Sequence, residues 1–104
     1  MADPVFVSVR LTPTDRDRFM SEYAAPLQSH NAAHGVEVLA GDADPRVIEG
    51  APPPRLNVLL KFPSMDAFDA WYSAPDYQPL KQKRIETTDH ASTEMIVLKA
   101  YGAA

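Results

Sequence analysis

Two separated stretches of the chain alternate between inward apolar side chains and a mixed second set, and this pattern constrains the fold most. Residues 5–11, VFVSVRL, place Val or Leu at every second position. In residues 55–62, RLNVLLKF, the set Leu, Val, Leu and Phe alternates with Arg, Asn, Leu and Lys. A period of two places successive side chains on opposite faces of a β-strand. Both stretches are therefore predicted to be strands with one face on a core.

A helix is expected after the first strand, because Thr12 suits an N-cap and Pro13 suits the first helical position. It should run to about Ala33, with Gly35 as its stop signal. Pro26 lies inside this span and should kink the helix or split it in two. The inward side chains recur at helical spacing: Phe19, Tyr23, Leu27, and His30 or Asn31.

Residues 36–40 alternate again, and 46–50 resume an extended pattern after the turn-forming GDADP. This indicates one bent strand, or a hairpin arm with a bulge. Three successive prolines at 52–54 predict a stiff connection, because they cannot donate ladder hydrogen bonds or continue a helix.

A short helix capped by Ser64 and ended by Pro75 is predicted next, with Met65, Phe68 and Tyr72 facing inward and Trp71 beside them. A second helical segment follows, with Tyr77, Leu80 and Arg84 on one face. The last strand is expected within residues 92–101.

The predicted order is β-α-β-β-α-β, the ferredoxin-like arrangement, as a single domain over residues 1–104. Right-handed crossovers would place both helical layers on one face of a four-stranded antiparallel sheet. The other face should carry apolar residues such as Phe6 and Leu59 among polar ones. A homodimer joined through this face explains the mixture better than a wetted surface, because a small chain gains stability by burying it.

Composition excludes several classes of function. The net charge of −4 argues against nucleic acid as a partner. The absence of cysteine excludes disulfides, thiolate catalysis and cysteine-ligated metals. No apolar run is long enough to cross a membrane, and no leader is apparent at the N-terminus, so we expect a cytoplasmic protein with no membrane partner. No Gly-rich phosphate loop precedes a helix, and no cofactor is expected.

The stretch from Glu49 to Arg84 resembles the bacterial family named domain of unknown function 1330, in the dimeric α+β barrel group. The matching pieces are Glu49-Gly50, Arg55, Phe62-Pro63-Ser64-Met65, Ala70-Trp71-Tyr72-Ser73, Pro75, Tyr77, Leu80 and Arg84. The resemblance implies the ferredoxin-like fold, a homodimer joined through its sheets, and a cavity between helices and sheet in each subunit. It implies no reaction. Proteins sharing the barrel include cofactor-independent monooxygenases, muconolactone isomerase-like proteins and haem-degrading enzymes.

The aromatic run at 62–78 has two interpretations. Trp71, Tyr72 and Tyr77 are most simply core side chains, but they could also line a pocket for a small planar ligand. Arg55 and Arg84 could each grip a carboxylate. They could instead have structural partners: Glu49 for Arg55, and Glu86, Asp76 or the carboxyl end of a helix for Arg84.

His30 and His34 have the i, i+4 spacing of a shared metal ion, but the rest of a metal signature is missing. We therefore expect no metal. A general acid or base role for His30 is the better hypothesis, because it lies on the stripe of Phe19 and Tyr23.

Two functional hypotheses result. In the first, the protein is a homodimeric, cofactor-independent enzyme, isomerase- or monooxygenase-like, that acts on a small aromatic or apolar carboxylate. In the second, the same fold is a binding or structural module without chemistry. The first hypothesis assigns His30 and Tyr72 to catalysis, and substrate binding to Tyr23, Arg55, Trp71, Tyr77 and Arg84.

Overall fold

The structure is a computed structural model that describes residues 2–53 and 55–103. Its main elements follow the predicted order, with the first helical layer built from three consecutive segments. The bounds are β1 (Val5–Leu11), α1 (Arg16–Arg18), the π-helix η1 (Phe19–Ala24), α2 (Ala25–Ala33), β2 (Glu37–Asp42), β3 (Leu56–Phe62), α3 (Met65–Ser73), α4 (Tyr77–Thr87), the 3-10 turn η2 (His90–Ser92) and β4 (Glu94–Lys99).

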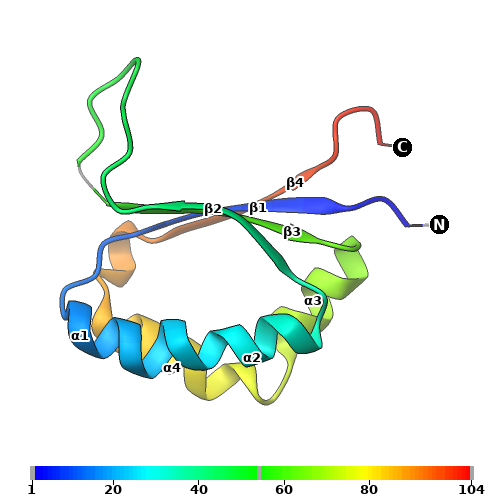
Figure 1. The fold of residues 1–104 in the computed structure, drawn as a ribbon, viewed down its shortest axis with the longest axis horizontal. Helices are drawn as coiled ribbons and strands as arrows, with labels where there is room; N and C mark the ends of the chain where they lie inside the picture. Colours follow the sequence, from blue (N-terminus) through cyan, green and yellow to red (C-terminus); the bar gives the residue numbers. More distant parts are fainter. Residues whose placement is uncertain (1, 54, 104) are drawn as a thin grey trace.

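The four strands form one antiparallel sheet in the order β2-β3-β1-β4. Figure 1 shows all the long helical segments on one side of this sheet. On the other side, the loop between β2 and β3 and the chain after β4 both rise away from the helices. The ferredoxin-like α+β fold is therefore confirmed, with one face of the sheet left uncovered by any described helix.

The two alternating strands lie side by side at the centre of the sheet. Val7 of β1 is opposite Leu60 of β3, and both side chains are buried against the helices. One residue further on, Ser8 is opposite Leu59 on the uncovered face. The predicted division of these strands into an inward and an outward face is confirmed.

The start of the first helix differs from the prediction. Asp15, not Thr12, is the N-cap, and its carboxylate accepts a hydrogen bond from the Arg18 amide at 3.2 Å. Thr12 and Thr14 are held elsewhere by backbone hydrogen bonds: the Asp89 amide donates to Thr12 and the Thr14 amide donates to the Thr87 carbonyl. Pairing with a segment distant in sequence thus takes precedence over the local capping signal.

Pro26 changes the hydrogen-bond register of the helix without interrupting it. The turn before it is a π-helix, in which the Ala25 amide donates to the Met20 carbonyl five residues earlier. A proline lacks an amide hydrogen and clashes with the carbonyl four residues before it. The wider turn makes room for this ring, and α2 then starts afresh with Pro26 in its first turn.

Two further expectations were wrong. Residues 46–50 form no strand, because β2 ends at Asp42 after a register shift between Val38 and Ala40. On α3, Met65 is exposed, whereas Trp71 is the most deeply buried side chain of that helix. Ser64 does cap α3, by accepting a hydrogen bond from the Ala67 amide at 3.0 Å.

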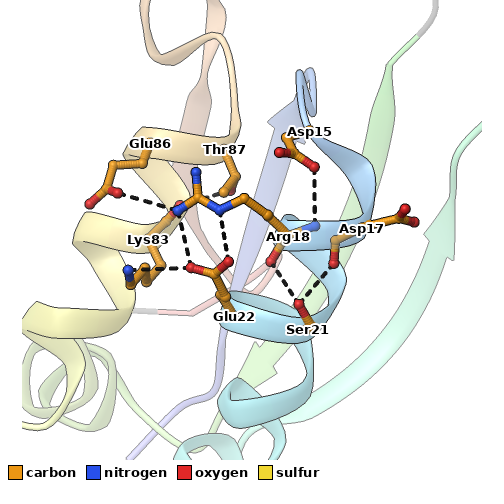
Figure 2. A network of polar contacts seen from close by, with 8 residues as sticks. All are labelled: Asp15, Asp17, Arg18, Ser21, Glu22, Lys83, Glu86 and Thr87. Carbon is orange, nitrogen blue, oxygen red and sulfur yellow. Dashed lines mark hydrogen bonds and ion pairs between the residues drawn. The ribbon is translucent and has the colours of Figure 1, made fainter.

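A polar network joins the first helical layer to α4 at the surface (Figure 2). The Arg18 guanidinium donates to Glu22 at 2.7 Å and to Glu86 of α4 at 3.4 Å. The Lys83 ammonium lies 3.3 Å from the second Glu22 oxygen. Hydrogen bonding to Arg18, opposed by desolvation and helped by Lys83, lowers the pKa of Glu22 to about 2.

Within the described part of the chain, no helix combines the length and apolar character that crossing a bilayer requires.

Candidate functional site

A cavity of about 210 Å³ lies between the helical layer and the sheet. Its walls are mostly aliphatic and aromatic side chains of the strands, η1 and α2. Gln28 on α2 and Val38 on β2 are both exposed and contribute to its lining, so the cavity opens beside the edge strand. An apolar cavity of ~150 Å³ is enough for benzene. This cavity therefore has room for a small ring compound.

Besides the exposed Gln28, three side chains with polar groups stand among these apolar walls: Tyr23, Asn31 and Trp71. The Trp71 indole N–H donates to the Asn31 side-chain oxygen at 2.8 Å. In the reverse direction, the Trp71 carbonyl lies 3.0 Å from Nε2 of His30. These two hydrogen bonds tie α2 to α3 and hold the indole ring against the cavity.

The contact with the Trp71 carbonyl shows which ring nitrogen of His30 carries a proton. A carbonyl oxygen only accepts hydrogen bonds, so Nε2 must carry a proton and donate it. In the neutral ring, Nδ1 is then the basic nitrogen. His30 is buried but does not line the cavity.

Tyr77 lies at the centre of the aromatic cluster behind the cavity. It is fully buried, and its hydroxyl is 2.9 Å from the hydroxyl of Tyr23. The His30 ring stacks on it at a centroid distance of 5.4 Å, and the Trp71 ring lies 4.4 Å away. Tyr77 therefore connects the groups on the cavity wall with those behind it.

The electrostatics of the cluster are governed by burial. Desolvation raises the pKa of Tyr23 well above its ordinary value, and the neighbouring Tyr77 adds to the shift. The charge of Arg84 acts in the opposite direction but is the smaller influence. At neutral pH, Tyr23 is thus a protonated phenol that can donate a hydrogen bond.

Arg84 is buried on the inner face of α4, two turns after Tyr77. Two of its predicted alternatives, an ion pair with Glu86 or with Asp76, are absent from the described structure. Glu86 pairs with Arg18 instead.

Tyr72 and Arg55 lie away from the cavity. The Tyr72 ring is half-buried on α3 and stacks on Phe68, and the Lys81 ammonium sits 4.8 Å from its centroid. Arg55 donates to the Ser92 carbonyl at 2.7 Å and pairs with Glu94 at 3.0 Å, rather than with Glu49.

The seven candidate residues therefore fall into three groups. Tyr23 and Trp71 line the cavity; His30, Tyr77 and Arg84 pack directly behind it; Tyr72 and Arg55 lie outside it. Sequence reasoning did not select Asn31 as a site residue, although it lies on the helical stripe that begins at Phe19. The catalytic and binding roles themselves remain predictions.

A larger groove of about 730 Å³ lies outside the fold, beneath the loop between β2 and β3. Arg10, Arg46 and Arg55 line it together with Asp44 and Glu49. Its open, charged surface suits solvent or a protein partner more than a small apolar ligand, for which the smaller interior cavity is the better site.

The rings of His30 and His34 approach to 4.6 Å. Across residues 2–53 and 55–103, no third acidic or histidine side chain joins them to form a metal-binding group.

Comparison with known proteins places this chain. The profile of a family described as Domain of unknown function (DUF1330) matches residues 4–101. The chain belongs to this family. A search of curated proteins found no significant match.

Solved structures with the same fold include proteins of known and unknown function. The RPA0582 protein of unknown function from Rhodopseudomonas palustris superimposes with a TM-score of 0.79 at 15% identity, covering 99% of this chain and 86% of that one. SnoaB, a cofactor-independent oxygenase from Streptomyces nogalater, has a TM-score of 0.66 at 16% identity, covering 98% and 97%. Rv0793 from Mycobacterium tuberculosis has a TM-score of 0.58 at 21% identity, covering 97% and 98%. At these identities the likeness establishes the fold alone, the ferredoxin-like α+β arrangement described above.

Proposed function

We propose that the protein binds a small aromatic or apolar molecule in the cavity beneath its helices. The observation that carries this proposal is the cavity itself, which combines apolar walls with the side chains of Tyr23 and Asn31. Apolar walls supply affinity, and a few placed polar groups fix orientation. With a volume of about 210 Å³, the cavity limits the ligand to roughly one ring with short substituents.

A cofactor-independent enzyme is the first form of this proposal. Tyr23 would donate a proton or a hydrogen bond to the ligand. His30 would be the general acid or base, acting through Nδ1 from its position behind the cavity wall. The fold shared with SnoaB supports an enzymatic role.

A binding module without chemistry is the second form. It is favoured by the position of His30, whose Nε2 is occupied by the Trp71 carbonyl and which does not reach the cavity wall. Liquid chromatography with mass spectrometry of a bound ligand, before and after incubation in air, separates the two forms. Only an enzyme converts the ligand, either to an oxidised product of higher mass or to an isomer with a different retention time.

The binding proposal can be tested by filling the cavity. Ala24 of η1 lines it, whereas the next residue, Ala25, is exposed. Ala24→Leu should abolish the thermal shifts that small aromatic compounds cause, and Ala25→Leu should preserve them. Equal shifts in both variants would place the ligand elsewhere.

We also propose a homodimer joined through the uncovered face of the sheet. Leu59, Ile96 and Leu98 are exposed there, with half-buried Phe6 among them. Exposed apolar side chains gathered on one face are typical of a site covered by a partner. A small chain also gains stability when a second copy covers such a face.

Sedimentation velocity tests the dimer. Ile96→Lys should dissociate it, because an ammonium would be buried at the interface. Met20→Lys is the matched control, since Met20 is equally exposed but lies on the helical side. A monomeric wild-type protein would overturn the proposal.

A further inference from the structure

Among the described residues, the interior contains a positive charge that no carboxylate pairs with. Arg84 is 3% exposed, and its Nε atom has no hydrogen-bond partner among the described residues. In the same part of the chain, no carboxylate pairs with its guanidinium, whereas Arg10, Arg18 and Arg55 each have a glutamate partner. Buried charges are normally paired, because removing an ion from water is costly unless an opposite charge replaces the solvent.

The position of this charge relates it to the cavity. Arg84 lies on the buried face of α4, which packs against η1, and Tyr23 of η1 lines the cavity and feels the charge of Arg84. The Tyr23 hydroxyl is in turn hydrogen-bonded to that of Tyr77. The guanidinium is therefore one side chain away from the space in which a ligand would lie.

Tyr23 does not supply the missing negative charge, because desolvation keeps its phenol protonated at neutral pH. The Tyr23 hydroxyl and the Arg84 guanidinium together thus carry one net positive charge. This charge acts through a medium of low polarity, where it is screened little.

We infer that the ligand of this cavity is a small monocarboxylate with an apolar or aromatic body, whose carboxylate accepts a hydrogen bond from Tyr23 and is neutralised by Arg84. This inference rests on the proposed function and adds the charge of the ligand. Apolar walls would hold the body of the molecule, and the polar cluster would select the anion over a neutral compound of the same shape.

The test compares benzoate with benzamide, which has nearly the same shape but no charge. Titration calorimetry of the full chain at neutral pH should give a Kd for benzoate about tenfold or more below that for benzamide. Benzamide binding as tightly as benzoate would overturn this inference and leave the proposed function standing. Binding of neither compound would count against the proposed function itself.

Variants then assign the preference to Arg84. Arg84→Met should bring the two dissociation constants close together, and Arg84→Lys should retain part of the preference because it keeps the charge. Arg46→Met removes the same charge from an exposed position and should leave the preference unchanged. A preference that survives in Arg84→Met would overturn the role of Arg84. If that variant does not fold, the wild-type ratio and the Arg84→Lys variant still decide the matter.

Discussion

Two arginines of this protein, Arg18 and Arg84, have opposite surroundings. Arg18 lies at the surface, donates to two glutamates and has Lys83 nearby as a second cation on Glu22 (Figure 2). Arg84, the residue after Lys83, points into the core and has no such partner within the described chain. Neighbouring positions on α4 thus carry one well-compensated and one uncompensated charge.

The two arginines differ in their effect on the stability of the fold. Exposed pairs contribute little, because water and salt screen them. An uncompensated buried charge lowers the stability of the fold, and such features are typically retained where they contribute to function. The surface network therefore helps to hold α4 against the first helical layer. The interior cluster around Arg84 is the better guide to activity.

The largest expected effect comes from the interior. Tyr77→Ala should lower the free energy of unfolding by about 3–5 kcal/mol, because it removes a fully buried ring and leaves a cavity. Urea denaturation measures this change. Tyr101→Ala is the matched control, since Tyr101 is fully exposed and its loss should change the unfolding midpoint very little. Similar midpoints for both variants would contradict the packing described for Tyr77.

Replacing the buried cation should have the opposite sign. Without ligand, Arg84→Met should raise the free energy of unfolding by about 1–4 kcal/mol, because an apolar side chain of similar length removes the desolvation cost. At the surface, Arg18→Met should lower stability slightly, through the loss of its two glutamate contacts. The same urea experiment checks both, and a destabilised Arg84→Met variant would indicate that the guanidinium has compensating contacts.

The smallest effect is the pH dependence of the surface network. The pKa of Glu22 is about 2 in the folded protein against 4.5 as its ordinary value, so the folded state binds this proton less readily than the unfolded state. Its stabilising contribution is therefore present above pH 4.5 and is lost as the pH falls towards 2. Glu22→Gln should flatten the urea midpoint over this range, and high salt should reduce the effect in wild type. A wild-type slope that persists in the variant would assign the titration to other groups.

Strand faces and helix positions could be predicted from the sequence because they follow from a period that burial imposes. The alternation of 5–11 and 55–62 requires no knowledge of distant residues, and neither does the Ser64 cap. Local signals failed where distant segments competed with them. Thr12 was expected to cap a helix, but it pairs with Asp89 across the fold.

The candidate site was predictable as a set of aromatic residues, but the arrangement of its charges was not. Whether Arg84 meets a carboxylate depends on distances between segments that are far apart in the chain, and these distances cannot be read from the sequence. Arg55 shows the same point, since its partner proved to be Glu94 and not Glu49. Asn31 belongs to the cavity wall, where its amide oxygen accepts a hydrogen bond from Trp71, forty residues later in the chain.

The two hydrogen bonds between α2 and Trp71 affect the route by which a ligand can enter the cavity. Because His30 and Asn31 each hydrogen-bond to Trp71, α2 and α3 should keep fixed positions on this side of the cavity. The edge strand β2, with its register shift and exposed Val38, is the side that can yield. A ligand would then enter the cavity past β2. A crosslink between α2 and β2 would slow its association and dissociation more than it would lower its affinity.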